Sequence, residues 1–340
     1  MVDLALLEDI AARAFRRERI FRDHQNMFDE GEEWLMSRFR LPRHVLLELC
    51  NSLEPHLQHP THCSHPVPPQ VQVLSTLGFL ATGTFQREIA DRAGISQPTL
   101  SRVIPKVLNG IIRQMPIVLK FLYDERRQSE VKRGLHGIAG MPNTVGAIDC
   151  THVRIKAPST NSMQFMNRKN YHSINVQVIC DADCRILNFV ARWPGGTHNS
   201  FILRNSGSAF EAGAVRDGWL VGDRGYGLKT WLMTPFANPQ TPQEVRYNTI
   251  HVHTRSVIER TFGQLKGRWM CLDTAGAIAH GIPIPAVAEP QPEEDAQPNE
   301  SQLIANNLIR KDAGRLTTFR ERLGSGWRDG VILRFTIIGA

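Results

Sequence analysis

Apolar and polar residues follow two different patterns along this chain of 340 residues. Up to about residue 135, apolar residues recur at helical spacing, which predicts packed helices. From about residue 140, short apolar segments bounded by glycines predict strands over TVGAIDCTHVRI, SINVQVICDADCRI, LNFVARWPGG and WLVGDRGYG. A short helix is expected over 200–210, KTWLMTPFANPQTPQEVRYNTIH is expected to be an irregular connection, and HTRSVIERTFGQLKGRW is strongly helical. We therefore expect an α/β domain with a mixed sheet, preceded by an α-helical region.

These patterns divide the chain into a helical N-terminal region (1–135), an α/β domain (140–275) and two further parts. Residues 276–300 are expected to form a disordered linker, because 281–300 contain five prolines, five acidic residues and no Lys or Arg. No role is predicted for 301–340. A second Pro-rich stretch, HLQHPTHCSHPVPP, is interpreted as a loop rather than a zinc site, since no second pair of ligands follows at finger spacing.

Residues 71–112 are organised as helix, helix, tight turn and helix, which predicts a helix-turn-helix. Gly94 is expected to end the second helix in a left-handed conformation, and Ser96 is expected to cap the third. An ordinary helical hairpin is the alternative, favoured by Pro105, which would kink the third helix or end it early. In a helix-turn-helix, the residues pointing toward DNA would be Gln97, Thr99, Ser101, Arg102 and Lys106.

The charge of the chain favours a nucleic-acid partner. Lys and Arg number 40 and Asp and Glu 33, a net charge of +7, and the five acids of 281–300 mean that the remainder carries +12. Such an excess favours binding to a polyanion such as DNA. No apolar run approaches the roughly 18 residues of a membrane span, no secretory signal is recognised, and the six cysteines form no CxxC pair. We expect an intracellular protein of the nucleus and cytoplasm.

Three carboxylates lie in or next to apolar segments, where a charged group needs a counter-ion or a metal. Asp149 lies in the apolar strand GAIDCTH, and Asp223 follows the strand of VGDRGYG. Glu259 lies near the edge of the apolar side of the helix SVIERTFGQLKGRW. A buried carboxylate is costly unless it is paired or binds a metal. Taken singly, each acid could instead cap a turn or form a salt bridge.

Together the three acids predict a metal site for phosphodiester hydrolysis. Such hydrolysis needs an activated water and a stabilised leaving oxygen, and divalent ions supply both. Mg²⁺ or Mn²⁺ prefers hard oxygen ligands and needs few of them from the protein. We therefore predict Asp149, Asp223 and Glu259 as catalytic metal ligands. No His/Cys set offers a comparable zinc site, and no phosphate-binding Gly-rich loop is present.

Cations near these acids and in the third helix are candidate DNA contacts. Each could instead be solvated or form an ion pair with one of the acids. The candidates are Arg102, Lys106, Arg154, Lys156, Arg168, Lys169, Arg255, Lys266 and Arg268.

Five segments, in order, resemble the PIF/Harbinger transposase family of the DDE superfamily: GAIDCTHVRI, NRKNYHSINVQVICDADCRI, ARWPGGTHNS, VGDRGYG and RSVIERTFGQLKGRWMCLD. The resemblance implies an RNase H-like nuclease fold with an Asp-Asp-Glu metal site, carried here by Asp149, Asp223 and Glu259. It also implies a Myb-like DNA-binding partner protein that aids nuclear entry and target binding.

The chain departs from the family pattern at two places. Asn199 stands where the family often has Asp, and its carbonyl oxygen would be a weaker metal ligand. After Asp273, an apolar helix typical of the family is expected to be missing, as in a splice variant or an imperfect gene model, which would impair folding and catalysis. The main hypothesis is thus a transposase-derived DNA endonuclease, and the alternative is a domesticated adaptor that binds DNA or a partner without cutting. A phosphatase or nucleotidase is disfavoured by the basic charge.

Overall fold

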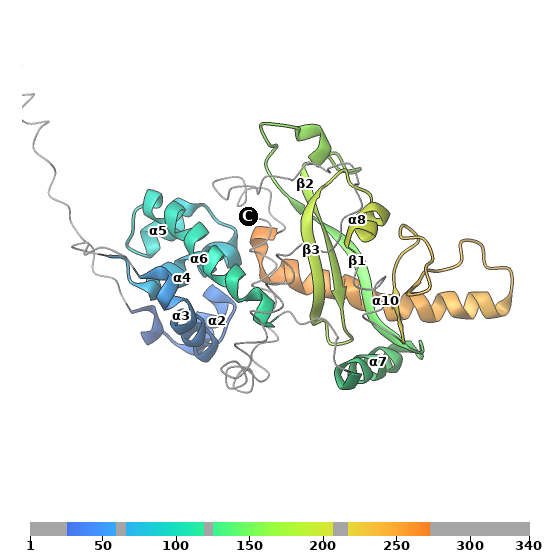
Figure 1. Cartoon of the computed structure of the whole chain (residues 1–340). Coiled ribbons are helices and arrows are strands. Elements are labelled where there is room, and N and C mark those ends of the chain that lie inside the picture. Colours follow the sequence, from blue (N-terminus) through green and yellow to red (C-terminus); the bar gives the residue numbers. More distant parts are fainter. Residues whose placement is uncertain (1–25, 59–65, 119–124, 207–216, 273–340) are drawn as a thin grey trace, which may run out of the picture.

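A computed structural model describes residues 26–58, 66–118, 125–206 and 217–272. In Figure 1 the helices of the N-terminal region are grouped beside a twisted sheet, and a long helix runs from the sheet toward that group. Three predictions lie outside the described residues: the missing helix after Asp273, the linker 276–300 and the tail 301–340. Residues 59–65 of the Pro-rich stretch HLQHPTHCSHPVPP also lie outside them. Within the described part, no helix has both the length and the apolar character needed to cross a membrane.

The N-terminal group is built around one helix whose sides are nearly all buried. Its elements are η1 (Met27–Asp29), α2 (Glu32–Phe39), α3 (Arg43–Leu57), α4 (Pro69–Thr82), α5 (Gln86–Arg92) and α6 (Gln97–Val118). Helix α4 buries residues on every side and contacts α2, α3, α5 and α6. A helix surrounded in this way is expected to be mostly apolar, and its buried polar residues Gln72, Ser75 and Thr76 each donate to a backbone carbonyl.

The turn between α5 and α6 has the predicted form. Gly94 has a φ of +67°, and the Ser96 side chain accepts a hydrogen bond from the N–H of Thr99 at 3.3 Å. Pro105 does not end the third helix early, because α6 continues to Val118. A proline inside a helix removes one backbone hydrogen bond and lowers stability, and the burial of one apolar side of α6 offsets this cost. The buried residues on that side are Leu100, Val103, Ile104, Val107, Leu108 and Ile111.

The sheet has five strands in the order β3-β2-β1-β4-β5. The strands are β1 (Thr144–Arg154), β2 (Ser173–Cys180), β3 (Ile186–Pro194), β4 (Trp219–Val221) and β5 (Leu232–Met233). Strands β1, β2 and β3 pair antiparallel, whereas β4 pairs parallel to β1 and to β5. The predicted mixed sheet is thereby confirmed. Strand β5 was not expected, since two residues carry no recognisable alternation.

The connection before the last helix was predicted wrongly. Helix α10 (Pro242–Arg268) begins inside the segment expected to be irregular. The Thr241 side chain and Glu244 form a reciprocal capping box at its start. The sequence Thr-Pro-Gln-Glu is a known signal for a helix start, so the start of α10 is encoded locally.

Helices cover the two faces of the sheet and join it to the N-terminal group. Helix α10 packs on β1 and β2, α8 (Asn199–Ser206) contacts β2, and α7 (Glu125–Ala139) packs on β1 and α10. At the end of α10, Trp269 is fully buried, η3 (Met270–Leu272) packs on α4, and Arg268 donates two hydrogen bonds to the carbonyl of Arg40. Helix α10 thus fixes the sheet against the helical group.

Candidate active site

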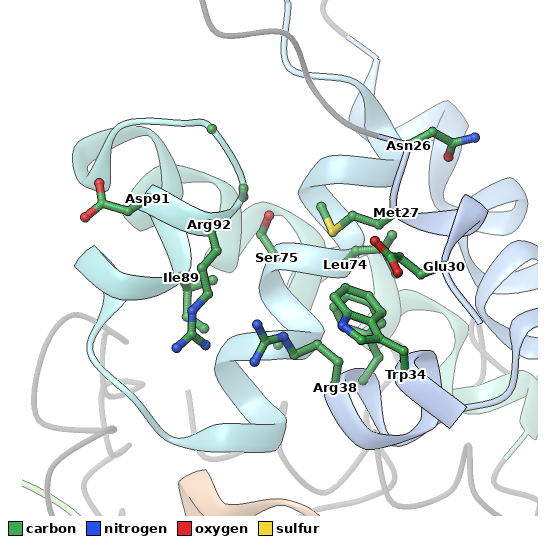
Figure 2. A pocket seen from close by; sticks show the side chains of 14 residues that line it. Asn26, Met27, Glu30, Trp34, Arg38, Leu74, Ser75, Ile89, Asp91 and Arg92 are labelled. Atoms are coloured by element: carbon green, nitrogen blue, oxygen red, sulfur yellow. The ribbon is translucent and has the colours of Figure 1, made fainter. Parts of the chain in front are cut away.

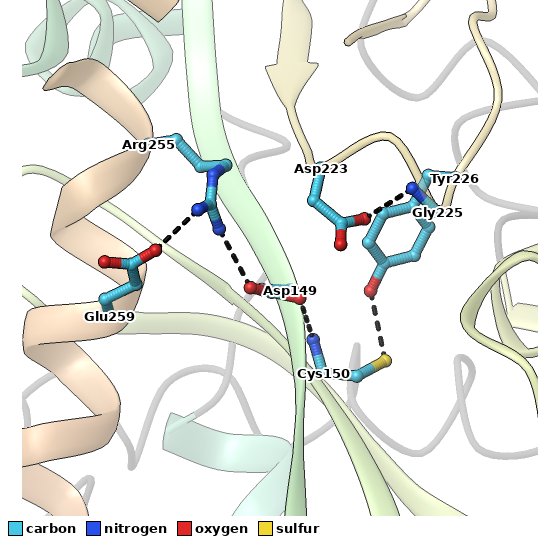
Figure 3. A network of polar contacts seen from close by, with 7 residues as sticks. All are labelled: Asp149, Cys150, Asp223, Gly225, Tyr226, Arg255 and Glu259. Atoms are coloured by element: carbon cyan, nitrogen blue, oxygen red, sulfur yellow. Dashed lines mark hydrogen bonds and ion pairs between the residues drawn. The ribbon is translucent and has the colours of Figure 1, made fainter. Parts of the chain in front are cut away.

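Asp149 and Asp223 occupy equivalent places on neighbouring parallel strands. Ala147 of β1 is the register partner of Val221 of β4, and each aspartate lies two residues beyond that pair. Because side chains alternate along a strand, residues two apart share a face. The two carboxylates are therefore on the same side of the sheet, in its centre (Figure 3).

Helix α10 adds the third carboxylate on this side. Glu259 lies on α10, and its carboxylate pairs with Arg255, whose guanidinium lies between Glu259 and Asp149 (Figure 3). The structure thus brings together Asp149, Asp223 and Glu259, which are 110 positions apart from first to last in the sequence (149 to 259).

Arg255 lies between two of the acids. Its Nη1 donates to Asp149 Oδ2 at 2.9 Å, and its Nη2 donates to Glu259 Oε1. The side chains of Arg255 and Asp149 are 19% and 17% exposed, whereas that of Glu259 is 60% exposed. The arginine therefore realises the ion-pair alternative that the sequence left open for this residue, and it neutralises a largely buried carboxylate.

The two aspartates are also held by backbone N–H groups. The N–H of Cys150 donates to Asp149 Oδ1 at 2.7 Å, and the N–H of Gly225 donates to Asp223 Oδ1 at 2.9 Å. A Cβ at position 225 would lie 3.1 Å from Asp223 Oδ1. Glycine at 225 therefore lets the turn close tightly around the carboxylate.

Burial raises the pKa of the Asp149 carboxyl to about 6. The N–H of Cys150 and the positive charge of Arg255 act against this rise, while the negative charges of Asp223 and Glu259 add to it. A carboxyl with a raised pKa, beside two further acids, is a group that a cation would stabilise in its charged form.

The donor set fits a hard divalent cation in its chemistry, but the present arrangement is not a closed metal cage. Carboxylate oxygens are the ligands that Mg²⁺ and Mn²⁺ prefer, and a positive guanidinium already lies between Asp149 and Glu259 (Figure 3). No group of three or more Asp, Glu, His or Cys side chains in the described part of the chain is arranged to hold a metal ion. Arg255 would have to leave Glu259 before all three acids could share a ligand.

Asn199 is not brought to this group. It begins α8, and its Oδ1 accepts a hydrogen bond from Asn175 Nδ2 at 3.2 Å. Asn175 is the register partner of His152, which lies an odd number of positions from Asp149 and so points to the opposite face. Asn199 therefore sits on the far side of the sheet from the carboxylates.

Several predicted DNA contacts gather near the end of β1. Burial lowers the pKa of His152, and the nearby positive charges of Lys266, Arg168 and Lys169 lower it further. Lys266 Nζ also donates to the His152 carbonyl at 3.0 Å. The exposed Arg168 and Lys169 are presented by a turn in which Asn167 Oδ1 accepts from the N–H of Lys169 at 2.9 Å.

The other predicted DNA contacts have separate positions. Arg154 is exposed and stacks 4.2 Å from the ring centroid of Tyr171, and Lys156 is exposed just beyond β1. Arg102 is exposed on α6. Lys106 Nζ donates to the Leu57 carbonyl at 2.8 Å, at the end of α3. Lys106, like Arg268, thus makes a structural contact within the helical part of the protein.

The sequence did not predict the contact between Cys150 and Tyr226 on the other face of β1. Cys150 Sγ lies 3.0 Å from the Tyr226 hydroxyl, on the face opposite Asp149. Tyr226 is almost fully buried, so it joins the turn after Asp223 to strand β1 (Figure 3). Both residues lie inside the motifs that carry the aspartates, but nothing in their spacing reveals the contact.

Comparison with known proteins gives a consistent match across this site. The family described as "DDE superfamily endonuclease" matches residues 148–287, a span that includes all three acids. "Putative nuclease HARBI1" of Homo sapiens is 39% identical over 261 residues, covering 76% of this chain and 75% of that protein. The Xenopus laevis protein of the same name is 34% identical over 263 residues, covering 77% and 76%. "Protein ALP1-like" of Arabidopsis thaliana is 27% identical over 221 residues, covering 59% and 53%. No solved structure matches significantly.

Proposed function

Because the chain belongs to the HARBI1 family of transposase-derived DDE superfamily endonucleases, we propose that it is a metal-dependent endonuclease that hydrolyses phosphodiester bonds in DNA. One observation carries this proposal. Asp149 and Asp223 stand at equivalent places on paired parallel strands, and Glu259 reaches the same side from α10.

The topology supports the RNase H-like fold implied by the resemblance to PIF/Harbinger transposases. Three antiparallel strands are followed by two parallel ones in the order β3-β2-β1-β4-β5. The first acid lies on the central strand, the second after the neighbouring parallel strand, and the third on a helix across them. This placement concentrates negative charge in the centre of one face.

The three carboxylates would hold the metal. When bound there, Mg²⁺ or Mn²⁺ would acidify the attacking water and stabilise the leaving oxygen. Asp149 and Asp223 are already fixed by backbone N–H groups, which limits the reorganisation needed. Glu259 is the most exposed of the residues in the Arg255 ion-pair network, so it can move toward the aspartates.

Arg255 would act as a stand-in cation: it would neutralise Asp149 and Glu259 when no metal is bound and contact the phosphate when a metal is bound. Its guanidinium holds Asp149 and Glu259 together while their charges would otherwise repel. If Asp149, Asp223 and Glu259 held a divalent ion, Arg255 would no longer be needed to neutralise them. Its guanidinium could then donate several N–H groups to a phosphate oxygen, a geometry for which arginine is well suited.

DNA would follow the exposed cations at the end of β1. Arg154, Lys156, Arg168 and Lys169 are exposed there, so their charged groups can contact phosphates, with Arg154 also stacked on Tyr171. The α5–α6 pair, interpreted as a helix-turn-helix, would add Arg102 as a contact from the helical region. By resemblance, a Myb-like partner protein would assist nuclear entry, and the chain would act in the nucleus as well as the cytoplasm.

An adaptor without cleavage activity is the second candidate function. It is favoured by the engagement of Arg255 with two of the three acids and by the absence of a closed metal cage in the described residues. An adaptor would retain DNA or partner binding, with Asp149 and Glu259 serving only as ion-pair partners of Arg255.

A cleavage assay separates these two functions. The full chain would be incubated with supercoiled plasmid and Mn²⁺, beside Asp149→Asn and the matched control Asp183→Asn, an exposed aspartate in the turn between β2 and β3. We expect nicking by the wild type and Asp183→Asn, and none by Asp149→Asn or in the presence of EDTA. Equal nicking by all three proteins would reject the proposed site, and no nicking by any would favour the adaptor.

A further inference from the structure

The helical group contains a cavity that the proposed nuclease does not use. It has a volume of about 430 Å³ and lies among η1, α2, α4, α5 and the turn after α5 (Figure 2). Pockets that bind ligands commonly have volumes of roughly 300–1,000 Å³. Its apolar lining includes Met27, Trp34, Phe39, Leu74 and Ile89. A large apolar side chain could therefore be accommodated there.

Two guanidinium groups face this cavity. Arg38 comes from α2 and Arg92 from the end of α5, and Figure 2 shows both directed toward the same space. Arg38 lies 5.6 Å from the centre of the Trp34 ring. Burial lowers the pKa of Arg38, and the like charge of Arg92 lowers it further.

Neither arginine of the pair has a close ion pair, although Glu30 and Asp91 also line the cavity. Arg38 forms no ion pair with a carboxylate in the described part of the chain, and the Glu88 partner of Arg92 is 3.9 Å away on the surface. Exposed ion pairs of this kind contribute little. Two like charges that share a partly desolvated cavity repel each other, so an anion bound between them would be stabilised.

Two acids in the lining argue against duplex DNA as that anion. Glu30 and Asp91 both line the cavity, and their charges would repel a run of phosphates. A single carboxylate on an apolar body carries one charge and is repelled less, and that charge can meet the arginines while the apolar body meets Trp34 and Met27. Trp and Arg are typical anchors of protein interfaces, and methionine adapts its shape to varied partners.

We propose that this cavity, here named the Arg38–Arg92 cavity, binds a peptide segment of a partner protein in which a large apolar side chain neighbours Asp or Glu. The apolar side chain fills the space beside Trp34, and the carboxylate pairs with Arg38 and Arg92. The proposal does not depend on nuclease activity, since none of these residues touches the carboxylate site.

The test uses the full chain and a defined panel of fluorescein-labelled peptides. Each peptide carries Leu, Ile, Met, Phe, Tyr or Trp at a set spacing from Asp or Glu, and a parallel panel carries Asn or Gln in place of the acids. Binding is measured by fluorescence anisotropy with the wild type, Arg38→Gln/Arg92→Gln and the control Arg87→Gln. Arg87 is exposed on α5 and does not line the cavity.

We expect a subset of the acidic peptides to bind with a Kd on the order of 1–100 μM. The double variant and the amide peptides should each weaken binding by about tenfold or more, and Arg87→Gln should leave it unchanged. Circular dichroism and thermal unfolding would establish that the variants are folded. Should the double variant lose helix content, Arg92→Gln alone serves, because this side chain is 48% exposed.

Three results would overturn the proposal. The first is that no acidic peptide of the panel binds. The second is that binding persists in folded Arg38→Gln/Arg92→Gln. The third is that a short DNA duplex, and not the peptides, loses affinity in the double variant, which would make the arginines phosphate contacts.

Discussion

Arg255 of helix α10 donates a 2.9 Å hydrogen bond to Asp149 in the centre of strand β1, across 106 positions of sequence. The same guanidinium reaches Glu259 one turn further along α10. This contact links the helix that carries the third acid to the strand that carries the first, and it places a positive charge where the proposed metal would bind.

Replacing Arg255 should alter metal affinity directly. In Arg255→Gln the competing charge is absent, so we expect Mn²⁺ to bind about tenfold more tightly by isothermal titration calorimetry. The metal-free variant should be about 1–3 kcal/mol less stable, because Asp149 loses its partner. Arg246→Gln, an exposed change on the same helix, is the control. Unchanged Mn²⁺ affinity in Arg255→Gln would contradict the stand-in role.

The raised pKa of Asp149 predicts a specific dependence of stability on pH. The ordinary value is 3.8 and the folded value is about 6, so the folded state holds a proton more tightly than the unfolded state. The resulting stabilisation is fully present below about pH 4 and is lost as the pH rises through 6. Relative to Asp149→Asn, the metal-free wild type should gain up to about 3 kcal/mol between pH 7 and pH 4. Urea unfolding at several pH values measures this, and parallel curves for the two proteins would refute it.

Gly225 should be needed for the position of Asp223. A methyl group at 225 would lie 3.1 Å from Asp223 Oδ1, so Gly225→Ala would push the carboxylate from its hydrogen bond. We expect Mn²⁺ binding weakened by about tenfold and a thermal midpoint close to that of the wild type. Normal Mn²⁺ binding would mean that the turn tolerates the shift.

Gly263→Ala on α10 is the control for Gly225→Ala, because it makes the same substitution outside the turn that holds Asp223. A Cβ there meets nothing within 4 Å, and alanine is favoured over glycine inside a helix by about 0.5–1 kcal/mol. Gly263→Ala should therefore raise the free energy of unfolding by about that amount and leave Mn²⁺ binding unchanged. A loss of stability would show that position 263 is more crowded than the structure indicates.

The exposed cations and Lys106 should behave differently in DNA binding. Removing the charges of Arg168 and Lys169 should reduce the slope of log K against log salt concentration by about 2, since each phosphate contact contributes about 0.9. Lys106→Gln should instead lower stability by about 1 kcal/mol through the lost bond to the Leu57 carbonyl. Anisotropy titrations of a labelled duplex at several salt concentrations would decide, and an unchanged slope in the Arg168/Lys169 variant would exclude these residues as contacts.

Local sequence determined the strands, the tight turn and the family. Strands β1 to β4 were predictable because they lie in short apolar runs bounded by turn residues such as Gly and Asp, and the turn at Gly94 and Ser96 because each residue has a strong local preference. The resemblance to PIF/Harbinger transposases, carried by five ordered motifs, is confirmed by the match to HARBI1. The start of α10 is also encoded locally, in the capping box of Thr241 and Glu244, although the segment was expected to be irregular.

Tertiary structure decided which groups meet. Asp149 and Asp223 share one face only because β4 pairs in parallel with β1 in a register that joins Ala147 to Val221. Asn199 lies on the face of the sheet opposite the three acids, where it accepts a hydrogen bond from Asn175. Arg255 was one of several cations in the motifs, and only the packing of α10 across β1 places its guanidinium between two acids. A residue's chemistry is local, but its partners depend on strand register and helix packing, which are set by contacts between residues far apart in the chain.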